Sequence, residues 1–131
     1  MFAVLALSLS AVLVDFQPTT AYAATISKDT TWGEGTRLSG SYVINPGVTV
    51  TITGKVTITE TKSVTISGGG TIKRGNESAY FNLPGKSGNI ATSFTLDNVT
   101  VDGDKIQAEK PMIENGTPGA TLTVKNCTVQ D

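Results

Sequence analysis

Two segments of the sequence repeat each other at a spacing of 28 residues. SFTLDNVTVDG at 93–103 aligns with TLTVKNCTVQD at 121–131, and in each segment the alternation of apolar residues slips by one position at an asparagine, Asn98 or Asn126. In a straight strand such a slip would turn the second half of the segment to the opposite face. A sharp bend at the asparagine keeps all the apolar side chains in one interior, and asparagine tolerates the left-handed backbone conformation that the bend needs.

An earlier segment, SVTISGGGTI at 63–72, fits the same pattern with one extra residue at its glycines, so that Gly69 takes the place of the bend asparagine. We expect the bend residues to stack, with the amides of Asn98 and Asn126 bonding along the stack. Repeated strand units at a spacing of about 20–30 residues predict an all-β parallel solenoid of about four coils.

The intervening sequence supports the same architecture. Between residues 48 and 72 valine and isoleucine alternate with threonine and serine, which predicts short strands with one buried face and one solvated face. Residues 76–92 and 104–119 are irregular and rich in Asn, Gly, Ser or Pro, so both are predicted to be loops. A short helical turn is expected around 106–110.

These repeats, together with GSYVINPGVTVTITGKVTITETKSVTISGGGTI at 40–72, resemble the pectate-lyase-like superfamily over residues 38–131. The resemblance implies a single-stranded, right-handed parallel β-helix, as in secreted bacterial polysaccharide-active enzymes and adhesin-like surface proteins. Such coils need covered ends, and the sequence stops at Asp131, directly after a predicted strand. We therefore expect the chain to be the N-terminal part of a longer, incomplete solenoid, or to associate end to end with another copy.

The N-terminal residues predict export. A twelve-residue apolar run at 3–14 is too short to span a bilayer, which takes about 20 residues, and Ala21-Tyr22-Ala23 is a pattern that signal peptidase accepts. The predicted organisation is a signal peptide at 1–23, an N-terminal cap at 24–40 and β-helix coils at 41–131, in a bacterial protein that is secreted or on the cell surface. Trp32 and Tyr42 are expected to cover the first coil.

Composition excludes several kinds of site. The net charge is −1, which offers no field for nucleic acid or an anionic membrane, and no membrane span is expected in the mature chain. The absence of histidine excludes a histidine-based triad or zinc ligand from this chain. The single cysteine, Cys127, matches Val99 in the repeat and is expected to be a small buried hydrophobe.

Carboxylates are the only candidates for catalysis or metal binding. Asp97, Asp102 and Asp104 follow one another in DNVTVDGD and are the candidates for a weak calcium site, although a solvated turn explains them more simply. Their counterparts in the next unit include Lys125 and Gln130, so the acidic cluster does not continue along the solenoid. No catalytic residue is therefore assigned.

Aromatic side chains give the remaining candidate site. Tyr80 and Phe81 lie in the predicted loop at 76–92, where an aromatic face could stack on a sugar, while anchoring of the loop is the simpler role.

Three functions remain open. The first is a non-catalytic, adhesin-like stalk that binds a polysaccharide or a host surface component. The second is the N-terminal part of a pectate-lyase-like or polygalacturonase-like enzyme whose catalytic coils lie beyond residue 131. The third is an ice- or surface-binding module that uses the threonine rows.

Overall fold

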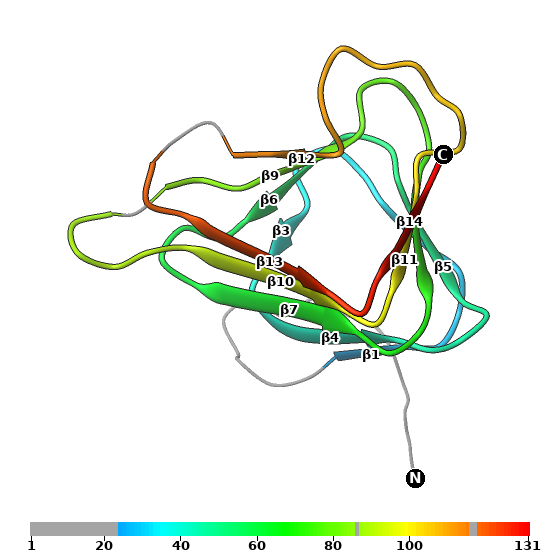
Figure 1. Cartoon of the computed structure of the whole chain (residues 1–131), viewed down its shortest axis with the longest axis horizontal. Helices are drawn as coiled ribbons and strands as arrows, with labels where there is room; N and C mark the ends of the chain where they lie inside the picture. The colour runs from blue at the N-terminus through cyan, green and yellow to red at the C-terminus, as the bar shows by residue number, and fades with distance from the viewer. Residues whose placement is uncertain (1–23, 86, 116–117) are drawn as a thin grey trace, which may run out of the picture.

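The computed structural model describes residues 24–85, 87–115 and 118–131, and every regular element in these ranges is a β-strand. The predicted signal peptide at 1–23 lies outside them. The strands form three parallel sheets that enclose an interior of roughly triangular outline (Figure 1). The chain visits the sheets in a fixed cyclic order, which is the topology of a parallel β-solenoid.

One turn of the chain around the interior is called a passage, and successive passages contribute strands to the three sheets in turn. Sheet A contains β1 (Ala24–Ile26), β4 (Gly40–Ile44), β7 (Ser63–Ser67), β10 (Ser93–Asp97) and β13 (Thr121–Lys125). Sheet B contains β2 (Thr30–Trp32), β5 (Thr49–Ile52), β8 (Thr71–Arg74), β11 (Thr100–Asp102) and β14 (Thr128–Gln130). Sheet C contains β3 (Arg37–Leu38), β6 (Lys55–Ile58), β9 (Tyr80–Asn82) and β12 (Ile113–Glu114).

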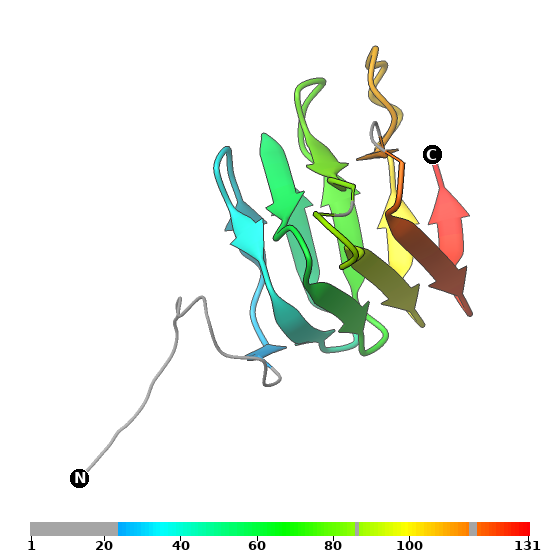
Figure 2. The same cartoon turned by 90° about the vertical axis from the view of Figure 1, so that its left-hand side faces the viewer.

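The strand register follows the sequence repeat. Phe94 pairs with Leu122 and Val101 pairs with Val129, as the spacing of 28 residues predicts. Toward the N-terminus Phe94 pairs with Val64, whereas Val101 pairs with Ile72, so the register shifts by the one extra residue at the glycines. Seen from the side, successive passages lie side by side, from the first strands at the left to β13 and β14 at the right (Figure 2).

Inward side chains of the stacked strands form the core. In β5, β6 and β8 the buried residues alternate with half-buried ones, which are mostly threonine or lysine. The core contains Leu38, Ile44, Val48, Val50, Ile52, Val56, Ile58, Val64, Ile66, Ile72, Ala79, Phe81, Leu83, Phe94, Leu96, Val99 and Val101. Burial of one such large side chain stabilises the fold by roughly 1.5–3 kcal/mol, so this column accounts for most of the favourable free energy.

The bends between sheets A and B lie where the sequence places them. Asn98, Asn126 and Gly69 have φ angles of 58°, 55° and 90°, all in the left-handed region. The bends stack through the backbone, because the N–H of Gly69 donates to the carbonyl of Asn98 at 2.7 Å. The expected bonding of one asparagine amide to the next is replaced by another contact: Nδ2 of Asn126 donates to Oδ1 of Asp97 at 3.1 Å.

The two predicted loops contain short strands. Tyr80–Asn82 forms β9 and pairs with β6, and Ile113–Glu114 forms β12 and pairs with β9. Strands of two or three residues are too short to show alternation clearly, although Ala79, Phe81 and Leu83 do alternate with polar or aromatic residues. The helical turn expected around 106–110 is not formed; these residues are irregular.

The two ends of the solenoid differ. Near the first strands the rings of Trp32 and Tyr42 meet edge to face at 5.8 Å and pack against the core; that they form a cap stays a prediction. At the other end Leu122, Val124 and Val129 occupy inward positions but are 40%, 47% and 72% exposed. Cys127, expected to be a small buried hydrophobe, packs against the core but is only half-buried.

Candidate functional site

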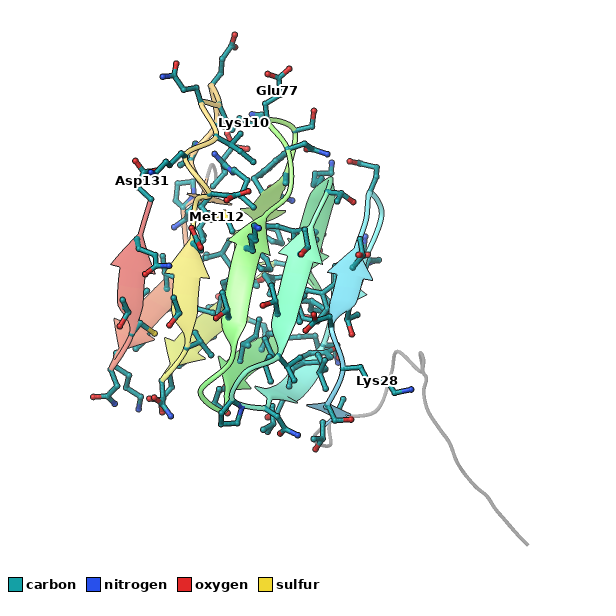
Figure 3. The ribbon with its side chains drawn as sticks, turned by 90° about the vertical axis from the view of Figure 1, so that its right-hand side faces the viewer. Lys28, Glu77, Lys110, Met112 and Asp131 are labelled. Carbon is teal, nitrogen blue, oxygen red and sulfur yellow. The ribbon has the colours of Figure 1, made fainter. Side chains whose placement is uncertain are left out.

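An open groove with a volume of about 620 Å³ lies beside Tyr80, one of the predicted site residues. It is lined by Glu77, Ser78, Tyr80, Gln107, Ala108, Glu109 and Lys110. Two segments form it, one after β8 and one after β11, and Figure 3 shows Glu77 and Lys110 on these two neighbouring segments. The groove therefore lies on the outer surface, where successive passages of the chain leave sheet B.

The first wall begins at Gly75, where the chain passes close to β5. A Cβ at this position would lie 2.7 Å from Cγ2 of Thr51 and 2.9 Å from the carbonyl oxygen of Ile52, so only glycine fits without a shift. Asn76 then holds the turn in place. Its Nδ2 donates to the carbonyl of Thr53 at 2.9 Å and its Oδ1 accepts from the N–H of Ser78 at 2.9 Å.

The second wall is held from beneath by a buried side chain. Nη2 of Arg74 donates to the carbonyl oxygen of Lys110 at 3.0 Å. On the outer side, Nζ of Lys110 forms an ion pair with Oε2 of Glu114 at 2.9 Å. The hydrogen bond from Lys110 and the negative charge of Glu114 raise the pKa of Lys110 above its usual value, so the ammonium stays charged near neutral pH.

Tyr80 places an aromatic ring in this groove. It lies on β9 at an outward position, beside Lys55 of β6, and its side chain is half-buried. Nζ of Lys110 lies 5.2 Å from the centroid of the ring, within the range of a cation–π contact. The groove thus combines one aromatic ring with a charged amine, two carboxylates, an amide and a hydroxyl, which can stack on an apolar ring and bond to hydroxyl groups.

Phe81 takes no part in this surface. It is 1% exposed, and its ring lies 5.2 Å from the ring of Phe94 inside the solenoid. Adjacent residues of a strand point to opposite faces, so Tyr80 and Phe81 could not both meet a ligand at the surface. The prediction that Phe81 contacts a carbohydrate is therefore corrected: Phe81 belongs to the core.

The three predicted calcium ligands are each engaged with neighbouring side chains. Oδ1 of Asp97 accepts from Asn126, and its Oδ2 lies 3.9 Å from Nζ of Lys125. Asp104 forms an ion pair with Lys73 at 3.5 Å, in the turn after Asp102. Within the described ranges no group of three or more Asp, Glu, Cys or His residues is arranged to hold a metal ion. Calcium binding by these residues stays a prediction.

Asp102 accepts a hydrogen bond through each of its carboxylate oxygens. Its Oδ1 accepts from the N–H of Asp104 at 2.8 Å, and its Oδ2 accepts from Nε2 of Gln130 at 3.2 Å. These two bonds, with a smaller contribution from the charge of Lys73, lower the pKa of Asp102 below its usual value of 3.8. Asp102 therefore connects the turn after β11 to β14, the neighbouring strand of sheet B.

The lowered pKa predicts how stability depends on pH. The ionised carboxylate is favoured in the folded state, so its contribution to the free energy of unfolding is present above pH 3.8 and is lost as the pH falls through the folded pKa. A carboxyl ¹³C titration should give a midpoint below 3.8 for Asp102. The substitution Gln130→Met, which removes one donor, should move this midpoint upward. A wild-type midpoint at or above 3.8 would contradict the geometry.

Outward threonines form rows across both larger sheets. Thr49, Thr71, Thr100 and Thr128 pair in sequence across sheet B, and Thr65, Thr95 and Thr123 pair across sheet A. These rows are β-branched residues on a solvated strand face, which sheets favour in any case.

The sequence interpretation missed most residues of the groove. Glu77, Gln107, Glu109 and Lys110 lie in irregular segments, where no motif marks them. The spacing of 28 residues could not have found them, because Phe81 pairs with Ile113, which lies 32 residues further along the chain.

No helix long and apolar enough to cross a membrane occurs within residues 24–85, 87–115 and 118–131. When the chain is compared with models of protein families, with curated proteins and with solved structures, none of them matches it.

Proposed function

We propose that the chain forms the first coils of an exported bacterial β-helix protein of the pectate-lyase-like kind, right-handed and non-catalytic over these residues, and that the groove beside Tyr80 binds a polysaccharide. The observation that supports this most is the half-buried ring of Tyr80 in an open groove of about 620 Å³ surrounded by polar side chains. A stack of coils presents such grooves along the side of an elongated stalk, where an extended polymer can lie across them.

The chemistry of the groove matches a sugar chain. The apolar face of a pyranose ring stacks on an aromatic ring, and its hydroxyl groups need both donors and acceptors. Glu77 and Glu109 supply acceptors, Lys110 supplies a donor, and Gln107 supplies both. Nζ of Lys110 lies over the ring of Tyr80, so it can contact the substituents of a sugar that binds beside this ring.

Replacement of Tyr80 by alanine tests this proposal. Binding of the chain to polygalacturonate, xylan, mannan and dextran would be measured by isothermal titration calorimetry. We expect at least one of these polymers to bind and Tyr80→Ala to weaken its binding by about tenfold or more, corresponding to about 1.4 kcal/mol. Tyr80→Phe keeps the ring and serves as the matched control, with an expected change of less than about threefold, under 1 kcal/mol.

Each outcome has a clear meaning. If none of the polymers binds, or if Tyr80→Ala binds as tightly as the wild type, the groove is not a polysaccharide site. Release of unsaturated or reducing ends from any polymer by this chain would overturn the non-catalytic role and favour the polysaccharide-degrading enzyme. Equal unfolding midpoints for the two variants would exclude a general loss of structure.

A further inference from the structure

Arg74 is a buried cation at an inward position of sheet B. It ends β8 and pairs with Ile52 of β5, which is fully buried. Arg74 itself is only 7% exposed and alternates with the buried Ile72. Arginine is rarely buried to this extent without a partner for its charge. The groups around the guanidinium of Arg74 should therefore include such a partner.

The guanidinium is only partly satisfied. Nη2 donates to the carbonyl oxygen of Lys110, but Nε is buried and has no hydrogen-bond partner within the described ranges. None of the three ion pairs formed by the described residues involves Arg74. A buried charged donor without an acceptor is strongly unfavourable, which points to an acceptor that comes from outside these contacts.

A pocket of about 360 Å³ gives access to this side chain. It is lined by Arg74, Val101, Gly103, Met112, Val129, Gln130 and Asp131. Gly103 follows the residue that pairs with Lys73, so it lies next above Arg74 in the column, and a Cβ there would lie 3.3 Å from Oδ1 of Asp131. Val129 at the mouth is 72% exposed, and Figure 3 shows Met112 and Asp131 at this end of the molecule.

We propose that this pocket binds a small aliphatic carboxylate, with the guanidinium of Arg74 as its anchor. A carboxylate matches the donor geometry of a guanidinium and carries the single negative charge that one arginine balances. Val101, Met112 and Val129 provide apolar contacts for a short hydrocarbon chain. Asp131 is exposed, so solvent screens its charge, but it disfavours a doubly charged phosphate.

The same chemistry has two sources. The carboxylate belongs either to a free small acid or to an acidic side chain of a second copy whose strand lies over β13 and β14. Both place a carboxylate on Arg74, in a pocket lined by other residues than the Tyr80 groove, although Arg74 also donates to the backbone of Lys110 in the wall of that groove.

The chain offers a sharp test because it contains only two arginines, Arg37 and Arg74. In a ¹⁵N-labelled sample their Nε–H groups give two signals, and Arg37, which is exposed on β3, serves as an internal control. Acetate and then butyrate would be added at constant ionic strength, with chloride and phosphate as reference anions. We expect the Arg74 signal alone to shift and saturate, with butyrate binding more tightly than acetate by about fourfold for each added methylene.

Because Arg74→Gln has no Arg74 signal, binding to the variants is followed by the backbone amide of Gly103, which lines the pocket. This amide should shift with butyrate in the wild type and in Arg37→Gln but not in Arg74→Gln; if Arg74→Gln fails to fold, the wild-type titration with its internal control still decides. Asp131→Asn should strengthen acetate binding by severalfold, because it removes a nearby negative charge. A shift of the Arg74 signal with protein concentration alone, reversed by acetate, would support the proposal with a second copy as the source.

Three outcomes would overturn it. In the first, the Arg74 signal fails to respond at tens of millimolar acetate or butyrate. In the second, chloride and phosphate shift the signal equally, which indicates that the anions only screen its charge. In the third, only the Asp131→Asn variant responds, which shows that Asp131 is itself the partner of Arg74 in the wild type.

Discussion

Replacement of Phe94 by alanine is expected to lower the free energy of unfolding by about 4 kcal/mol. The side chain of Phe94 is fully buried, and its ring packs against Phe81 at 5.2 Å, so the truncation leaves a cavity that the rigid stack of strands cannot close. Since small domains are stable by only about 5–15 kcal/mol, this loss is a large share of the total. Urea unfolding followed by far-UV circular dichroism measures it.

Leu122→Ala is the matched control for Phe94→Ala. The two residues pair directly across β10 and β13 and occupy the same inward column, but Leu122 is 40% exposed. We expect its truncation to cost about 1 kcal/mol, because part of its surface already meets water. Equal losses for the two variants would contradict the burial difference, and they would show that Leu122 is covered in solution.

Replacement of Gly68 by alanine is expected to be nearly as damaging, with a loss of about 3 kcal/mol or more. Gly68 has a φ of +111°, and a Cβ there would lie 2.5 Å from the carbonyl oxygen of Ile44 and 2.9 Å from its nitrogen. These are backbone atoms of the neighbouring passage, so relief of the contact would require the stack itself to open. The same unfolding measurement applies.

Gly47→Ala separates the strain from the contact. Gly47 also has a positive φ, of +83°, but a Cβ there would meet no atom within 4 Å. Gly47→Ala should lower the free energy of unfolding by only about 1 kcal/mol, because a residue with a side chain is strained in a left-handed conformation. If Gly68→Ala costs no more than Gly47→Ala, the close approach of Gly68 to Ile44 does not exist in solution.

The repeat in the sequence was sufficient to predict the register and the bends. The residues that pair with Phe94, Leu96 and Val101 in the next passage must also point inward. The apolar pattern therefore determines the strand pairing. The asparagine bends followed from the same constraint, because a left-handed bend at the asparagine keeps both halves of the repeat facing the interior. Handedness does not follow from spacing, and it remains part of the proposal.

The candidate site was less predictable, for two physical reasons. The groove is built from irregular segments that stacking alone brings together, so Lys110 reaches Tyr80 without any local pattern to show it. Phe81 could have been placed correctly from the alternation of Ala79, Phe81 and Leu83, a pattern obscured by the glycines and polar residues that follow. Arg74 could not be placed, because a charged residue at a strand end is ordinarily solvated.

The three corners of the solenoid differ in how much sequence change they can absorb. From β4 onward the corner between sheets A and B is a tight bend with left-handed residues such as Asn98, whereas the segments after sheets B and C vary greatly in length between passages (Figure 1). Insertions at those two corners leave the pairing of the flanking strands unchanged. A lineage or a protein engineer can therefore diversify these segments as a library of binding surfaces, while the asparagine corner must be inherited intact.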